Sequence, residues 1–377
     1  MVILHIVDPT TGLDAFDTLA LLVNTMPGTQ HVLVLGHYGW SDAAVLAGIP
    51  RRVLHWSRAL GRWDPTVRPA VRRAIQEIQP SHVHAWGGWS MNALGGFDGP
   101  CLASVQLPQS QRQLAILRSA MKQRPWLVLT TSHAAREFLV HAGLARLRLL
   151  AVAPGAWTAP HLPPVPRNLR RILGLQPREG PILLLGGWSE PTFRQDHAIW
   201  ATAIISHLYP EVWGLIRSDP IPRQEWVHPF AGYQSFTHTL KDPQLIAIAP
   251  VQYSWRQLAA FADLFVFTPA GPAGMNSLLA ALACGKPIVS TATAPVRELL
   301  EDGQNALLAA PENPREIAAR IHTLLHDDAL RQRLSAAAQA TFQRYCSGPR
   351  LTEQMASIYA QVEQDPALRN PVAPPPL

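Results

Sequence analysis

One loop of the sequence contains the residue types that hold a phosphate. Residues 262–290 read ADLFVFTPAGPAGMNSLLAALACGKPIVS, a pattern in which a buried strand leads through a glycine-containing turn into a short helix. Glycines let an anion approach the backbone, and the N–H groups and dipole at a helix start attract negative charge. We therefore expect a phosphate site at Gly271, Gly274, Asn276 and Ser277. In the plainer alternative, Asn276 or Ser277 only caps the helix.

The elements that must position this loop follow from the pattern of apolar runs. Short runs rich in β-branched residues and leucine alternate with helical patterns, which is typical of βαβ units and parallel sheets. Strands are expected at residues 2–7, 31–35, 52–55, 82–85, 101–105, 127–130, 147–151, 182–185, 212–216, 246–249, 264–267 and 287–290. Helices are expected at residues 14–24, 67–78, 133–142, 314–325, 329–345 and 351–362, with a further short helix from Asn276 to Gly285.

A proline-rich segment divides the chain into two α/β domains. Residues 154–166 carry five prolines, which cannot continue a helix or a central strand, so we expect a stiff linker. We predict a Rossmann-like domain over residues 1–153, the linker over residues 154–166 and a second Rossmann-like domain over residues 167–345. A final helix over residues 346–365 could cross back to the first domain, and we expect a disordered proline-rich tail over residues 366–377. Ligands of open α/β sheets bind beyond the carboxyl ends of the strands, so we expect the site in a cleft where the two domains face each other.

Composition excludes several classes of protein. Hydrophobic residues make up 47% of the 377 residues, which argues against a disordered chain, and the length suggests more than one domain. The net charge of +6 comes without a block of basic residues, so it indicates either solubility or attraction to a phosphorylated ligand, and we expect no nucleic-acid partner. The distant cysteines Cys101, Cys284 and Cys346 exclude a disulfide framework and a cysteine zinc site, and they fit a reducing cytoplasm.

The sequence predicts neither a targeting segment nor a membrane span. The first residues, MVILHIVD, have no basic region and too short an apolar stretch for a signal peptide, and no long apolar run occurs elsewhere. Basic stretches with Trp and Leu at residues 51–63, 68–73 and 111–126 are either solvated helix faces or segments that lie on an anionic membrane surface. No metal spacing such as His-Glu-x-x-His is present, so we expect no metal.

Several segments resemble one enzyme family. ADLFVFTP, LLAALACGKPIVS and VRELLEDGQNALLAAPENPREIAARIHTLLHDDALRQRLSAAAQATF resemble the donor-binding half of family 4 glycosyltransferases, and MVILHIVDPTTG, IQPSHVHAW and LTTSHAAREFLVHAGL resemble their first half. The resemblance implies the GT-B fold, an α/β architecture in which two Rossmann-like domains face a central cleft and C-terminal helices pack back toward the first domain. It also implies transfer of a sugar from a nucleotide diphosphate sugar to an acceptor that the sequence does not identify, without a metal or another cofactor.

The resemblance also assigns further donor-binding residues. It places Gly12, Arg194 and Glu298 beside the phosphate site, and it places the nucleotide base near Val251, Gln252 and Tyr253. A guanidinium at Arg194 suits a diphosphate because its donors match two phosphate oxygens at once. Each assignment has a structural alternative: Gly12 serves a turn, Arg194 is a solvated charge, and Glu298 pairs with Arg297 or caps a helix.

In the first domain the same resemblance singles out residues on the acceptor side. His84 lies where the family has the first histidine of a pair at a strand end, which makes it a catalytic candidate, and Trp86 occupies the position of the second. Gln106 stands where the family has another histidine, and its amide could bind a sugar. The alternative for His84 is a buried histidine of the core.

The sequence departs from the family's pattern at chemical positions. Pro272 and Ala280 stand where the family has two glutamates, and Gly187 stands where it has an arginine. These departures motivate a second hypothesis, a GT-B homologue that has lost catalysis and binds a nucleotide or a partner. A nicotinamide-dependent enzyme is disfavoured because DPTTGLDAF, and not Gly-x-Gly-x-x-Gly, follows the first strand.

Overall fold

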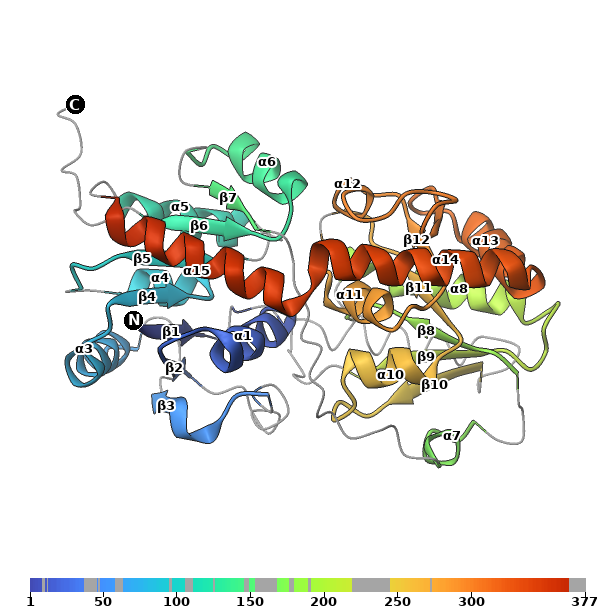
Figure 1. Ribbon diagram of the computed structural model, residues 1–377, viewed down its shortest axis with the longest axis horizontal. Coiled ribbons are helices and arrows are strands. Elements are labelled where there is room, and N and C mark those ends of the chain that lie inside the picture. Colours follow the sequence, from blue (N-terminus) through green and yellow to red (C-terminus); the bar gives the residue numbers. More distant parts are fainter. Residues whose placement is uncertain are drawn as a thin grey trace. The chain divides into compact units, whose positions relative to one another are not determined.

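The computed structural model of the chain divides into two compact units. The described residues are 1–8, 11, 13–36, 46, 48–57, 64–94, 97–105, 111–124, 126–145, 149–152, 168–175, 180–188, 191–218, 245–271 and 273–365. The first unit comprises Met1–Trp157 and Gly348–Leu377, and the second comprises Thr158–Ser347 (Figure 1). The predicted linker and tail, residues 154–166 and 366–377, lie outside the described residues.

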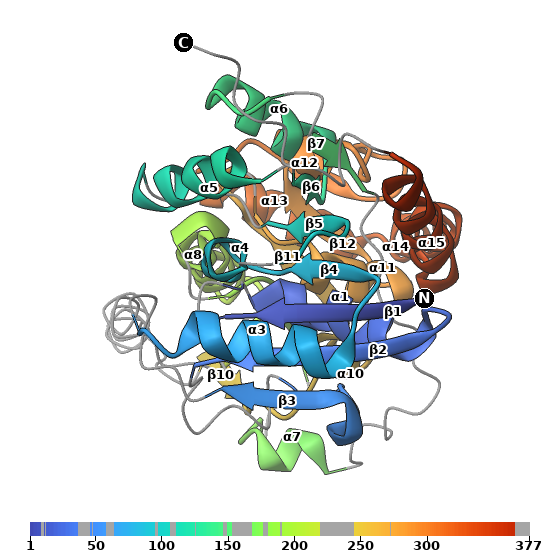
Figure 2. The same ribbon diagram turned by 90° about the vertical axis from the view of Figure 1, so that its left-hand side faces the viewer.

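The first unit is built on a seven-stranded parallel sheet. Its strands follow the order β3-β2-β1-β4-β5-β6-β7, and Figure 2 shows β3, β2, β1 and β4 in this order. The strands are β1 (Val2–Val7), β2 (Thr29–Leu35), β3 (Leu54–Ser57), β4 (His82–Ala85), β5 (Cys101–Ser104), β6 (Leu127–Thr130) and β7 (Leu149–Ala151). The helices are α1 (Leu13–Thr25), η2 (Arg51–Val53), α3 (Val67–Ile78), α4 (Gly88–Ala93), α5 (Gln111–Gln123), α6 (His133–His141) and α15 (Gly348–Gln364).

The second unit is built on a six-stranded parallel sheet of order β10-β9-β8-β11-β12-β13. Its strands are β8 (Ile182–Leu185), β9 (Trp213–Arg217), β10 (Ile246–Ala249), β11 (Leu264–Phe267), β12 (Ile288–Thr291) and β13 (Leu307–Ala309). Its helices are α7 (Leu169–Ile172), η4 (Pro191–Phe193), α8 (Gln195–Ile205), α10 (Trp255–Phe261), α11 (Asn276–Ala283), α12 (Ala294–Arg297), α13 (Pro314–His326), α14 (Asp328–Thr341) and the π-helical turn η6 (Phe342–Cys346).

The predicted fold class is confirmed, since both sheets are parallel and alternate with helices. The patterns missed several elements, among them the helices α4, α8 and α10 and the strand β13. Helix α8 lacks the polar face that marks an amphipathic helix, because the apolar Trp200 and Ile204 lie on its exposed side. Strand β13 has only three residues, which is too short to show a period. The predicted helix 329–345 is α-helical to Thr341 and then continues as η6.

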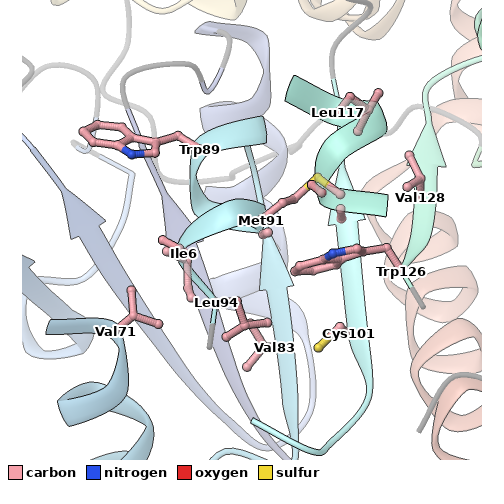
Figure 3. Close-up of a cluster of buried hydrophobic side chains, with 14 of the residues drawn as sticks. Ile6, Val71, Val83, Trp89, Met91, Leu94, Cys101, Leu117, Trp126 and Val128 are labelled. Atoms are coloured by element: carbon pink, nitrogen blue, oxygen red, sulfur yellow. The ribbon is translucent and has the colours of Figure 1, made fainter. Parts of the chain in front are cut away.

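Each unit has its own apolar core. In the first unit, side chains from β1, β4, β5 and β6 meet side chains from α3, α4 and α5, as Figure 3 shows for Ile6, Met91 and Trp126 among others. In the second, Leu183, Val266 and Val289 of the sheet meet residues of α8, α13 and α14. The regular alternation of apolar runs in the sequence thus corresponds to strands buried on both faces.

Helix α15 is fastened to the sheet of the first unit by buried polar groups. The hydroxyl of Tyr359 lies 2.6 Å from Nδ1 of His84, and the carbonyl oxygen of Tyr359 lies 3.1 Å from Nε2 of His82. All three residues are fully buried. Burial raises the pKa of Tyr359, so its hydroxyl stays protonated. The last helix is therefore held in the first unit by hydrogen bonds as well as by packing.

A buried histidine beside this cluster must remain neutral. His5 Nε2 lies 3.0 Å from Oε1 of Gln30, and the indole N–H of Trp86 donates to His5 Nδ1 at 3.1 Å. Because an indole nitrogen only donates, Nδ1 must accept, and the imidazole carries its proton on Nε2. Burial lowers the pKa of His5 to about 4 and also lowers the pKa of His84.

These lowered pKa values predict a loss of stability in mild acid. An unfolded histidine binds a proton below about pH 6.5, whereas the folded His5 stays neutral to about pH 4. Unfolding therefore becomes easier as the pH falls between these values, by roughly 2 kcal/mol at pH 5 from His5 alone. Urea unfolding at pH 7.5 and pH 5 measures the change. His5→Gln should reduce it, and the exposed His322→Gln serves as control; an unchanged pH dependence in His5→Gln would contradict the account.

Candidate functional site

The strand order of the second sheet places a candidate site at the ends of β8 and β11. These two strands are neighbours, and the chain proceeds outward from them in opposite directions, to β9 and β10 on one side and to β12 and β13 on the other. Open α/β sheets bind ligands at such a switch in strand order, beyond the carboxyl ends of the strands. The segment after β8, Gly186–Trp188, is joined to the first turn of α11, because the N–H of Gly187 donates to the hydroxyl of Ser277.

Residues 268–271 and 273–275, called the phosphate loop below, are fixed at Thr268 and Pro269 by buried hydroxyl groups. The hydroxyl of Thr268 donates to the carbonyl oxygens of Phe193 and Arg194 at 3.1 and 2.8 Å. The hydroxyl of Thr291, at the end of β12, donates to the carbonyl oxygen of Pro269 at 2.5 Å. Both threonines are buried, so these bonds are shielded from water. The loop is therefore held in place before any ligand arrives.

The phosphate loop leads directly into helix α11. Met275 occupies the N-cap position and supplies no side-chain cap, and the first hydrogen bond of the helix runs from Leu279 N to Met275 O at 2.8 Å. The first N–H groups of a helix have no partner within it. Phosphate binding at the start of α11 stays a prediction, which rests on the general affinity of helix N-termini for anions.

The four residues predicted for the phosphate site lie together at this helix start. Gly271 and Gly274 are partly exposed in the loop, and a Cβ on Gly271 would meet nothing within 4 Å. Asn276 and Ser277 form the first turn of α11 and are buried. The alternative that Ser277 caps the helix is wrong, because its hydroxyl accepts a hydrogen bond from the N–H of Gly187 at 3.0 Å. Ser277 joins the two segments of the site instead.

The glycine turn after β8 is held by hydrogen bonds to both backbone groups of Gly187, its N–H and its carbonyl oxygen. Gly187 donates its N–H to Ser277, and its carbonyl oxygen accepts from Nε2 of the buried Gln195 at 2.7 Å. Its φ of +89° lies in the left-handed region, and a Cβ there would overlap Phe193. The arginine that the family has at this position does not fit this backbone. Sequence reasoning missed Gln195, which belongs to the unpredicted helix α8.

Arg194 lies next to the phosphate loop, with its charge already paired. Its Nε and Nη2 donate to the two carboxylate oxygens of Asp196 at 3.1 and 3.0 Å, and Nη1 donates to Glu312 at 2.7 Å. Nη2 also contacts the ring of His197. Arg194 and Glu312 both have positive φ, at 44° and 62°, which indicates that the fold imposes this pair. Two carboxylates offset the guanidinium, which weakens its attraction for a diphosphate.

The residues predicted for the nucleotide base form a turn after β10, at the same end of the sheet. The N–H of Tyr253 donates to the carbonyl oxygen of Pro250 at 3.1 Å, and the carbonyl oxygen of Val251 accepts from Arg217 at 3.0 Å. Tyr253 is buried and Gln252 is exposed at the tip. Glu298 is an exposed residue that ends α12, the helix after β12.

In the first unit, His84 has the surroundings of a core histidine. Its Nε2 lies 2.9 Å from the hydroxyl of Ser104, its Nδ1 contacts Tyr359, and its ring stacks on Trp86 with centroids 4.5 Å apart. Burial holds the pKa of His84 well below its ordinary value. Because both ring nitrogens are engaged, the structure favours the structural alternative over the predicted catalytic role. Gly12 and Gln106 lie outside the described residues.

Two of the three basic stretches of the first unit, those in α3 and α5, bury their apolar sides in the protein, whereas residues 51–57 of the third have no buried side chain. In α3, Val67, Val71 and Ala74 are buried, and in α5, Leu114 and Leu117 belong to the core cluster. This packing favours helices with a solvated basic face. No helix within the described ranges is long and apolar enough to cross a membrane. Among the same residues, no three His, Cys, Asp or Glu side chains gather as a metal ion would require.

Comparisons with known proteins agree with this architecture. Residues 253–341, which include the phosphate loop and α11, match the family model of glycosyl transferases group 1. The chain is 26% identical over 306 residues to a D-inositol 3-phosphate glycosyltransferase of Xylanimonas cellulosilytica, covering 74% of this chain and 71% of the relative. Among solved structures it resembles Anabaena HepE in complex with UDP-glucose, with a TM-score of 0.78, 19% identity and coverage of 96% and 100% of the two chains.

A further solved structure points to the same fold. Sucrose-phosphate synthase from Thermosynechococcus elongatus matches with a TM-score of 0.73 and 15% identity, over 96% of this chain and 99% of the other. The likeness to these structures shows the GT-B fold. The family model and the Xylanimonas relative together show a glycosyltransferase, and the predicted enzyme class is confirmed.

The glycine turn gives a prediction about stability. Gly187→Ala should destabilise the protein by about 2–4 kcal/mol, because the methyl group adds an overlap with Phe193 to the strain of a left-handed backbone. Gly303→Ala is the matched control: its φ is +73°, but a Cβ there meets nothing within 4 Å, so only the strain of about 1 kcal/mol remains. Urea unfolding compares the two. Equal losses would show that the turn after β8 is not tightly enclosed.

Proposed function

We propose that this glycosyltransferase uses a nucleoside diphosphate sugar and holds its diphosphate at the phosphate loop and the start of α11. The observation that carries the proposal is a helix start whose N-cap residue does not cap it, next to a loop fixed by Thr268 and Thr291. HepE, which shares the fold, was solved in complex with UDP-glucose, and this supports the same class of donor. The base would lie against the turn formed by Val251, Gln252 and Tyr253.

In this proposal the backbone stabilises the leaving group. Breaking the bond between the sugar and the diphosphate puts negative charge on the departing phosphate oxygens. N–H groups that are already fixed in position lower the energy of this charge without reorganising during the reaction. The hydroxyl of Ser277 contributes indirectly, because it holds the Gly186–Gly187 turn against the start of α11. Donor binding by Gly12, Arg194 and Glu298 remains a prediction, and so does acceptor binding by Trp86 and Gln106.

Because the two family glutamates are missing, their side chains are not available to hydrogen-bond the donor sugar and the ribose. Ala280 is buried within α11 and cannot accept a hydrogen bond through its side chain, and Pro272 lies outside the described residues. An inactive homologue that only binds a nucleotide was the alternative from sequence. The family model and the named relative both favour an enzyme, so we retain transfer as the proposed activity.

Calorimetry and turnover together test this function. Purified protein is titrated with UDP, ADP, GDP, CDP and dTDP, and sugar release is then followed with the nucleotide sugars of any nucleotide that binds. We expect binding of at least one nucleoside diphosphate and release of sugar to an acceptor or slowly to water. Binding without any sugar release would favour the inactive alternative, and no binding of any nucleotide would overturn the proposal.

A larger side chain in the phosphate loop should weaken donor binding without lowering the stability of the protein. Gly271→Val should weaken nucleoside diphosphate binding by about tenfold or more, because the valine side chain fills space that the phosphate needs. A tenfold loss corresponds to about 1.4 kcal/mol of binding free energy. The stability of this variant should change little, because a Cβ at Gly271 meets nothing within 4 Å. Gly303→Ala should show the reverse, lower stability with unchanged binding. Full nucleotide binding by Gly271→Val would place the diphosphate elsewhere.

A further inference from the structure

Arg217, at the end of β9, packs against two buried tryptophan rings that also contact each other. Its guanidinium carbon is 4.8 Å from the ring centroid of Trp188 and 5.5 Å from that of Trp255. The two rings meet edge to face, with centroids 5.2 Å apart and an interplanar angle of 68°. Both tryptophans are almost completely buried, at 3% and 2% exposure. A planar guanidinium is attracted to aromatic faces, so this arrangement fixes the side chain of Arg217.

The fixed guanidinium in turn holds the turn after β10. Nη2 of Arg217 donates to the carbonyl oxygen of Val251 at 3.0 Å. The neighbouring strands are joined at the same place, because the N–H of Ser218 donates to the carbonyl oxygen of Ala249 at 2.9 Å. Trp188 follows β8 and Trp255 begins α10, which has a capping box at Ser254. One charged side chain therefore ties together the ends of three strands and the start of a helix.

We propose that Arg217 is a positioning residue that sets which nucleobase the enzyme accepts. The inference rests on the proposed function, in which the base lies against the turn that contains Val251. Arg217 donates a hydrogen bond to the carbonyl oxygen of Val251 and thereby orients the turn, whose exposed tip is Gln252. A glutamine amide both donates and accepts hydrogen bonds, so it can distinguish the polar edges of bases only if its backbone is fixed. Arg217 supplies that fixation without contacting the diphosphate.

Two substitutions separate this role from a merely structural one. Arg217→Met removes the charge and the hydrogen bond but still packs against the two rings, and Arg217→Lys keeps the charge with a single donor group. Arg333→Met is the matched control, because it also removes a hydrogen bond from an arginine to a backbone carbonyl, that of Gly303 at 3.0 Å on the surface. Dissociation constants are measured for UDP, CDP, ADP and GDP, and for pyrophosphate as a probe of the phosphate loop.

The wild-type protein should prefer one nucleoside diphosphate over the others, and Arg217→Met should reduce this preference by about tenfold, the effect expected for one hydrogen bond to a charged group. Arg217→Lys should lie in between, while binding of pyrophosphate and the behaviour of Arg333→Met stay as in the wild type. If Arg217→Met does not fold, Arg217→Lys is judged by the same ratio.

Other results overturn the inference. A wild-type protein without base preference, an unchanged preference in both Arg217 variants, or an equal loss for all nucleotides and pyrophosphate would each contradict a role in base selection. Failure of the wild type to bind any nucleoside diphosphate would instead overturn the proposed function on which the inference rests. The wild-type titration therefore distinguishes the two failures.

Discussion

One constraint governs the proposed site: hydrogen bonds made by Ser277, Thr268 and Thr291 fix the segments around the start of α11, at the carboxyl end of a parallel sheet. Met275 does not cap α11, and the hydroxyl of Ser277 is committed to Gly187. Thr268 and Thr291 fix the loop that precedes the helix. We propose that the first N–H groups of α11 receive the phosphate of the donor.

Two arginines of the second unit, among the residues that the structure describes, have structural partners. Arg194 is paired with Asp196 and Glu312, and Arg217 packs against two tryptophan rings and donates to a backbone carbonyl. A diphosphate at this site would therefore be neutralised mainly by fixed backbone dipoles, which need no rearrangement when charge develops. Gly187 carries no arginine side chain that could bind the diphosphate, and the turn there requires a left-handed backbone.

The sequence predicted the elements well where a local pattern defined them. Strands buried on both faces appear as short apolar runs, and the turn from β11 into α11 was predicted because glycines precede helix-favouring residues there. Helix α8 and strand β13 were missed, because one lacks a polar face and the other is too short. The partners of Ser277 and Arg194 could not be predicted, since Gly187 and Glu312 lie 90 and 118 residues away along the chain. The strand pattern alone did not show whether His84 is a buried core histidine or lines a site. Its burial and its hydrogen bonds became visible only in the structure.

The most direct test is a crystal structure of the protein with a nucleoside diphosphate bound. The account predicts oxygens of the terminal phosphate within hydrogen-bond distance of the backbone N–H groups at the start of α11, while the bond between Ser277 and Gly187 stays intact. A nucleotide found away from this helix start, or a Ser277 hydroxyl that leaves Gly187 to bind the phosphate itself, would contradict it.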